Sequence, residues 1–267
     1  MLDPSPLLPV TPLSEVLLAQ LVAELDNEHI RGICLGGSHA RGEATPYSDV
    51  DIACFVPDSY RPLRKRFMYR DGQLVSIALK TLEGVRQQIS EPDQALWIVP
   101  SFRQSRVLLD KDGSMRQLKQ MVEEFSWEPL RSEAIGFAGH ILICDAELVH
   151  KLFSNLWKGN LSGVSYVTTG LLESVTEAMM LYHAVFITTD SLYYEEVERA
   201  VGLDTRWTHY HRLLTGTETG PEETGSIEVR AKVALHLYAE TASLLYPVLS
   251  EQRRAVIEEV LRMIEGV

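Results

Sequence analysis

Residues 32–56, with the sequence GICLGGSHARGEATPYSDVDIACFV, are the most informative stretch of this chain for its fold and its function. A short apolar strand leads into Gly36-Gly37-Ser38, where the missing Cβ atoms let backbone N–H groups approach an anion and the hydroxyl adds a donor. After a polar turn, a second apolar strand carries Asp49 and Asp51, whose spacing of two places both carboxylates on one face. Two hard oxygen ligands beside a phosphate-binding turn predict a site for Mg²⁺ that carries a nucleoside triphosphate.

The order of these motifs resembles the signature of the nucleotidyltransferase superfamily, in which Gly-Gly-Ser is followed, after ten intervening residues, by Asp-x-Asp on a strand. The strings Gly37-Ser38-x-Ala40-Arg41-Gly42 and Ser48-Asp49-x-Asp51 are most similar to the bacterial branch, which includes antibiotic adenylyltransferases. The resemblance implies in-line transfer of a nucleoside monophosphate, with ATP as the expected donor, to an acceptor hydroxyl, with release of pyrophosphate. It also implies a fold, namely a nucleotidyltransferase core of the DNA polymerase β type with a mixed sheet.

The same resemblance assigns roles to individual residues. Gly36, Gly37 and Ser38 are expected to hold the β and γ phosphates, while Asp49 and Asp51 are expected to be catalytic and to bind one or two Mg²⁺ ions.

Three neighbouring polar residues have less definite roles. Arg41 and Ser48 are candidate nucleotide-binding residues, although Arg41 can equally support the turn and Ser48 can bond to the neighbouring backbone. His39 is expected to face solvent.

One part of the family pattern is missing. Full members carry a third carboxylate on a neighbouring strand, but the candidate strand, Leu74–Lys80, contains no acid, and Ser76 stands in roughly the expected place. This leaves three possibilities: catalysis with a base supplied elsewhere, weak activity, or a nucleotide-binding protein that transfers nothing.

The helical second half offers candidates for the missing functions. Glu173, four residues before Glu177 on a long helix, is a candidate catalytic base, and Lys158 is a candidate contact for the triphosphate. The alternatives are an exposed helix face for Glu173 and an interaction with the helix dipole for Lys158.

Charge differs between the two halves of the chain. Residues 1–127 hold 14 Lys and Arg against 17 Asp and Glu, whereas residues 128–267 hold 11 against 20. A nucleic-acid acceptor is not expected, because no basic face is evident. The acidic second half suits a small cationic acceptor such as an aminoglycoside, although the same carboxylates can simply keep helices solvated.

Composition places the chain among globular proteins of the cytoplasm. It has 267 residues, 45% of them hydrophobic, with no apolar run long enough to span a bilayer and no signal peptide. Its three cysteines form no Cys-x-x-Cys motif, so neither disulfides nor a zinc site are indicated.

Periodicity predicts an α+β nucleotidyltransferase domain over residues 1–127 and an all-helical, substrate-binding domain over 128–267. In the first, a helix over 12–28 capped by Thr11 precedes the motif strands, and Asp71-Gly72 predicts a hairpin between 65–70 and 73–80. In the second, no strand alternation is found, and the predicted helices are 131–156, 161–187, 191–201, 225–247 and 251–264.

Two other functions remain open at this stage. One is a regulatory or toxin–antitoxin-type module that binds or modifies a macromolecule, and the other is a catalytically silent nucleotide-binding protein.

Overall fold

The computed structural model describes residues 13–60, 65–218 and 226–266. The chain divides into two compact units, residues 1–126 and 127–267. Within the described ranges, none of the helices combines the length and the apolar character needed to cross a membrane.

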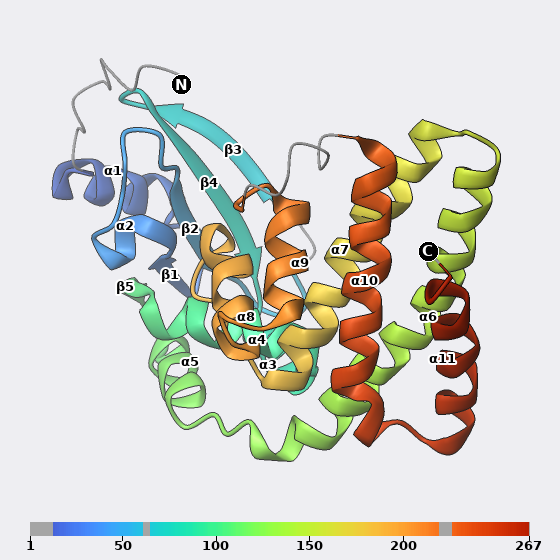
Figure 1. Cartoon of the computed structure of the whole chain (residues 1–267). Coiled ribbons are helices and arrows are strands. Elements are labelled where there is room, and N and C mark those ends of the chain that lie inside the picture. The colour runs from blue at the N-terminus through green and yellow to red at the C-terminus, as the bar shows by residue number, and fades with distance from the viewer. Residues whose placement is uncertain (1–12, 61–64, 219–225, 267) are drawn as a thin grey trace. The chain divides into compact units, whose positions relative to one another are not determined.

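The first unit is built on a mixed five-stranded sheet, which confirms the predicted fold class (Figure 1). The strand order is β3-β4-β2-β1-β5, and β2 pairs with β4 in parallel while the other pairs are antiparallel. The strands are β1 (Gly32–Leu35), β2 (Val50–Phe55), β3 (Lys65–Arg70), β4 (Gln73–Lys80) and β5 (Arg106–Asp110). The strand that carries Asp51 is therefore central, and β3 lies at one edge.

The turn between β3 and β4 forms as predicted. Asp71 and Gly72 both have positive φ angles, 49° and 80°, as the tight hairpin turns with two left-handed residues require. This turn fixes the register of the hairpin, in which Phe67 pairs with Ser76.

The helices among the described residues of the first unit are α1 (Glu15–Leu25), α2 (Gly37–Arg41), α3 (Leu82–Ser90), α4 (Pro92–Gln104) and α5 (Ser114–Glu123). The first begins later than predicted, because Ser14 caps it by accepting a hydrogen bond from the Leu17 N–H at 3.0 Å. The expected cap, Thr11, lies outside the described residues.

One face of the sheet packs against helix α1. Val50 and Ile52 of β2 point to this face and are 0% and 2% exposed, and they pack in one cluster with Leu17 and Leu21 of α1. Because side chains alternate along a strand, Asp51 points to the other face. The core packing thus decides which way the acidic side chains point.

The second unit contains no strand among its described residues, in agreement with the prediction. Its main helices are α6 (Arg131–Trp157), α7 (Leu161–His183), α8 (Tyr193–Val201), α9 (Arg206–Thr215), α10 (Ile227–Leu245) and α11 (Glu251–Ile264). The predicted helix over 161–187 ends four residues early because Ala184 adopts the left-handed conformation, with φ of 55°. Helix α9 was not predicted, since its many polar residues hide the apolar face that buries Trp207 and Leu214.

Candidate functional site

Strand β2 sets the direction of the two acidic side chains. Asp49 immediately precedes the strand, which begins at Val50, so the expectation that both acids lie within it is corrected by one residue. The alternation still holds, because Val50 and Ile52 are buried whereas Asp49 and Asp51 are only partly buried. Among the described residues Asp49 has no hydrogen bond or ion pair, which leaves its carboxylate available to a ligand.

The turn at Gly36 and Gly37, called the glycine turn from here on, lies directly against the Asp51 carboxylate. The Gly36 N–H donates to the backbone oxygen of Asp51 at 2.8 Å, and this bond ties the end of β1 to β2. Gly37 has a φ of 61°, and a Cβ built there would lie 2.3 Å from Oδ2 of Asp51. Both the backbone conformation and the contact therefore require glycine at this position.

The expected turn after Gly37 is in fact the first turn of helix α2. At every helix N-terminus the first backbone N–H groups have no carbonyl within the helix to bond to. In α2 these are the N–H groups of Gly37, Ser38 and His39. The left-handed Gly42 then ends the helix after five residues. The arrangement places the N-terminal turn of α2 beside the Asp51 carboxylate.

The other polar residues of the motif make local contacts. Ser48 Oγ accepts a hydrogen bond from the Thr45 N–H at 2.9 Å, and Arg41 Nε donates to Glu43 Oε2 at 2.7 Å. Both contacts support the alternative in which these residues stabilise the loop that leads to Asp49. The expectation for His39 is wrong, since its Nε2 is buried and has no partner among the described residues.

Ser76 occupies the position at which a third carboxylate was expected. It pairs with Asp51 across the parallel strands β2 and β4 and is 2% exposed. Register partners in neighbouring strands share a face, so Ser76 and Asp51 lie side by side.

The donor set fits Mg²⁺ bound together with a triphosphate. The described residues contain no group of three or more His, Cys, Asp or Glu side chains that could hold a metal by itself. Mg²⁺, however, usually takes only one or two carboxylates and completes its shell with water and substrate phosphates. Asp49 and Asp51 beside the donors of Gly37 and Ser38 supply this combination.

The two candidates from the second half both lie in the second unit. Glu173 of α7 is exposed and accepts a hydrogen bond from the Tyr194 hydroxyl. Lys158 is exposed at the C-terminal end of α6, and its backbone N–H donates to Ser154 O at 3.1 Å. Their catalytic and phosphate-binding roles remain predictions.

Asp145 is an unusual residue that the sequence analysis missed. It is 3% exposed, its Oδ1 accepts from the Ser174 hydroxyl at 2.7 Å, and its Oδ2 has no partner among the described residues. Burial raises the pKa of this carboxyl to about 7. Its sequence signal is an acid within the apolar stripe of α6, three residues after Leu142 and four before Val149.

Replacing Asp145 with Asn is expected to stabilise the second unit at neutral and alkaline pH. The folded pKa lies above the ordinary value of 3.8, so ionisation costs the native state progressively more stability between about pH 4 and pH 7. The free energy of unfolding of the variant should therefore exceed that of the wild type by on the order of a few kcal/mol at pH 8, and should equal it at pH 4. Urea unfolding at both pH values measures this, with Glu133→Gln, at an exposed position of the same helix, as control. An equal change at pH 4 and pH 8 would contradict the assignment.

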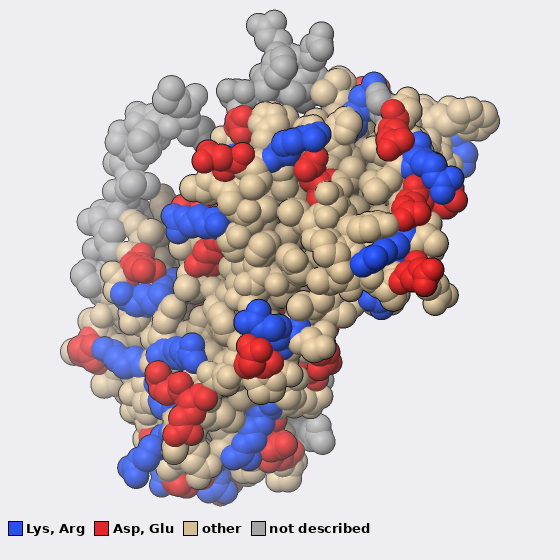
Figure 2. All heavy atoms as spheres, turned by 60° about the horizontal axis from the view of Figure 1, so that its bottom comes forward, with Lys and Arg blue, Asp and Glu red and all other residues tan. Residues whose placement is uncertain are grey.

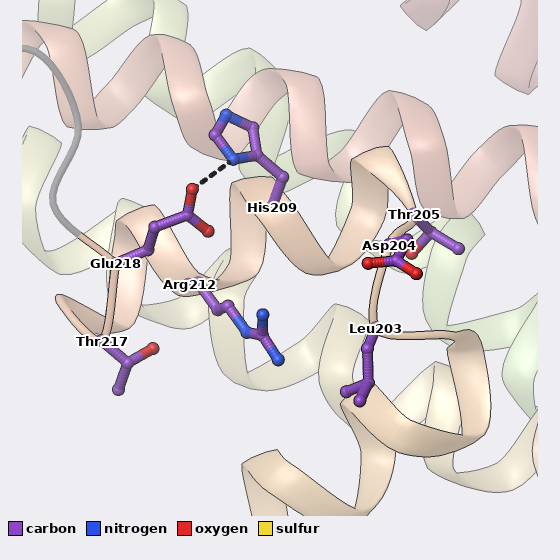
Figure 3. A pocket seen from close by; sticks show the side chains of 7 residues that line it. All are labelled: Leu203, Asp204, Thr205, His209, Arg212, Thr217 and Glu218. Carbon is purple, nitrogen blue, oxygen red and sulfur yellow. Dashed lines mark hydrogen bonds and ion pairs between the residues drawn. The ribbon is translucent and has the colours of Figure 1, made fainter.

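The second unit also contains a pocket of about 480 Å³ at α9 (Figure 3). Its polar groups are largely satisfied by each other: His209 Nδ1 lies 2.9 Å from Glu218 Oε1, and Arg212 Nε donates to the buried Glu198 at 2.8 Å. The residues that line it are Leu203, Asp204, Thr205, His209, Arg212, Thr217 and Glu218. We do not assign a catalytic role to this pocket.

Comparison with known proteins agrees with the geometry of the first unit. A family model described as a nucleotidyltransferase domain matches residues 18–108. No curated protein matches the chain. Among solved structures, a nucleotidyltransferase-like protein from Exiguobacterium sibiricum is similar, with 12% identity, a TM-score of 0.49, and coverage of 93% of this chain and 87% of that chain. The matched segment contains the glycine turn, both acidic residues, strands β1 to β4 and the first part of β5. Residues 18–108 of this chain are therefore similar to nucleotidyltransferase domains, in agreement with the resemblance found in the sequence.

Proposed function

We propose that the protein transfers AMP from ATP to a hydroxyl group of a small, cationic acceptor and releases pyrophosphate. The observation that carries this proposal is the contact between the Gly37 backbone and the Asp51 carboxylate. It supports a site in which the first turn of α2, with its backbone donors for phosphate, lies next to a carboxylate that can bind a metal.

Each residue of the site has a proposed role that follows from its chemistry. The backbone N–H groups of Gly37 and Ser38 and the Ser38 hydroxyl bind the β and γ phosphates, where the N-terminal end of α2 favours negative charge. Asp49 and Asp51 would hold Mg²⁺, which when bound neutralises phosphate charge and stabilises the entering and leaving oxygens. Arg41 and Ser48 hold the loop in place. The protein thus contributes mainly positioning and charge complementarity.

The acceptor is proposed from charge and from the second unit. Residues 128–267 hold 11 Lys and Arg against 20 Asp and Glu, which favours a cation. On the face drawn in Figure 2, acidic and basic side chains are interspersed. Glu173 is the proposed base for the acceptor hydroxyl.

Ser76 favours a second candidate function, that of a nucleotide-binding protein that does not transfer. A hydroxyl at 2% exposure supplies no negative charge beside Asp51, so a second metal ion would have fewer ligands there.

Pyrophosphate release separates the two functions. The full-length protein is incubated with Mg²⁺, each of the four NTPs and a panel of aminoglycosides, and thermal stability is measured in parallel. Stabilisation by MgATP together with acceptor-dependent pyrophosphate release supports transfer. Stabilisation without release supports the silent protein, and no stabilisation by any Mg-NTP contradicts both.

A further inference from the structure

The end of strand β4 holds a lysine that has no anionic partner in the described part of the chain. The Lys80 side chain is partly buried, and its ammonium makes no hydrogen bond or ion pair with another described residue. The ammonium lies instead over an aromatic ring, with Nζ 5.6 Å from the centroid of the buried Phe102. Burial lowers the pKa of this ammonium. Because a partly desolvated charge without a counterion is costly, an anion that binds there stabilises the folded chain.

Lys80 lines a cavity of about 730 Å³ that is formed by residues of β4, α3 and the start of α4. This volume is typical of sites for small molecules. A second lysine of the lining, Lys65, is exposed, and its ammonium lies over the Phe67 ring at 4.8 Å from the centroid. Lys80 is therefore the cation that the cavity offers to a ligand. The other polar residues of the lining are Tyr60, Thr81, Gln87, Gln88, Glu91 and Gln94.

The carboxylate in this lining is already bonded to amides. Glu91 Oε1 accepts a hydrogen bond from Gln87 Nε2 at 3.1 Å, and its Oε2 accepts one from the Gln94 amide. Within the described ranges neither oxygen lies within ion-pair distance of Lys80. The acid is thus held away from the lysine, and the charge of Lys80 remains available to a ligand.

The cavity is separate from the candidate nucleotide site, although both lie on one face of the sheet. Asp51 pairs with Ser76, and Phe55 pairs with Lys80 four residues further along both strands. At about 3.3 Å per residue, the backbone of Lys80 lies about 13 Å from that of Ser76. The glycine turn contacts Asp51 at the start of β2. The proposed phosphate donors and Lys80 therefore lie at opposite ends of this strand.

We propose that the cavity binds a small organic anion whose carboxylate or phosphate group lies against the Lys80 ammonium. Lysine binds either group as a compact point charge. The N-terminal end of α3, which Thr81 caps, follows Lys80 directly and favours the same sign of ligand charge. The amide of Gln88 and the hydroxyl of Tyr60 can bond to polar groups on the body of the ligand. This second ligand site does not depend on the proposed function.

Isothermal titration calorimetry of the full-length protein at low salt tests this proposal. The probes are glycerol 3-phosphate, malate and uncharged glycerol. The wild-type protein should bind at least one of the two anions and not glycerol, and the anion that binds identifies the group that Lys80 accepts. Lys80→Met keeps the length of the side chain but removes its charge, so the affinity should fall at least about tenfold. Lys80→Arg keeps the charge and should retain most of the affinity.

Lys151→Met is the matched control. It removes an equal charge from an exposed ion pair with Glu147 in the second unit, and it should leave the affinity for the anion within about twofold. The proposal is overturned if neither anion binds or if Lys80→Met binds as tightly as wild type.

Thermal stabilisation by MgATP separates this proposal from the proposed function. It should be equal in wild type and Lys80→Met, because Lys80 lies far from the glycine turn. Loss of stabilisation in Lys80→Met would place Lys80 in the nucleotide site and overturn the proposal. If MgATP fails to stabilise wild type while an anion binds at Lys80, the proposed function falls and the anion site stands.

Discussion

Asp49→Asn or Asp51→Asn is expected to lower the rate of nucleotide transfer at least about a hundredfold, because each replacement removes a negative ligand worth several kcal/mol of charge stabilisation. Asn keeps the size of Asp, so the direction of the strand and its core contacts are preserved. The fold should be largely preserved, since the apolar neighbours of these residues on β2, Val50 and Ile52, pack on the opposite face of the sheet and are unchanged. Pyrophosphate release at saturating Mg²⁺ and ATP measures the effect.

Asp58→Asn is the matched control for both variants. Asp58 is an exposed carboxylate that follows the same strand beyond its far end. Its replacement changes the net charge equally and should leave the rate within about twofold, because exposed charges interact weakly. Normal transfer in both site variants would show that the reaction does not use these carboxylates.

Gly37→Ala is expected to lower the rate of transfer by about a hundredfold, although it removes no ligand or donor. The replacement displaces groups of the site, and a displacement of about 1 Å at a reacting centre has an effect of this size. The new Cβ would lie 2.3 Å from Asp51 Oδ2, so either the carboxylate rotates away or the first turn of α2 shifts. In both cases the phosphate donors and the metal ligand lose their relative placement. The affinity for MgATP, measured by calorimetry, should fall as well.

Gly42→Ala separates this contact from the cost of backbone strain. Gly42 has a φ of 75°, similar to that of Gly37, but a Cβ there meets nothing within 4 Å. Both alanines should therefore destabilise the fold by about 1–2 kcal/mol, the cost of a left-handed non-glycine residue. Only Gly37→Ala should lose nucleotide binding. Equal losses of MgATP affinity in the two variants would mean that helix strain, and not contact with Asp51, explains the effect.

Local rules predicted much of the first unit. The glycine turn, the alternation around Asp51 and the Asp71-Gly72 hairpin each depend on a few adjacent residues, and each is found in the structure. The predicted nucleotidyltransferase resemblance is confirmed by the family match over residues 18–108. The alternation also survived the error in the start of β2, because it depends on residue parity and not on where the strand begins.

What escaped prediction depends on contacts between distant residues. The buried position of Asp145 follows from the packing of α6 against α7, with its partner Ser174 supplied from 29 residues away. The exposure of Phe67 and Tyr69 was not predicted, because it depends on the strand order, which places β3 at the end of the sheet. The pairing of Ser76 with Asp51, by contrast, was approximated from the sequence because both residues lie on regular strands.

The position of β1 between β2 and β5 affects how the chain can fold while it is being synthesised. Gly32 pairs with Phe55 on one side and with Asp110 on the other, 78 residues later. The backbone of β1 on the side of β5 therefore stays unpaired until the ribosome has released residue 110. Domains generally fold as units during synthesis, and pairings of high sequence separation form slowly. For most of the translation of the first unit, β1 is consequently an open edge that a chaperone can protect or a neighbouring nascent chain can capture.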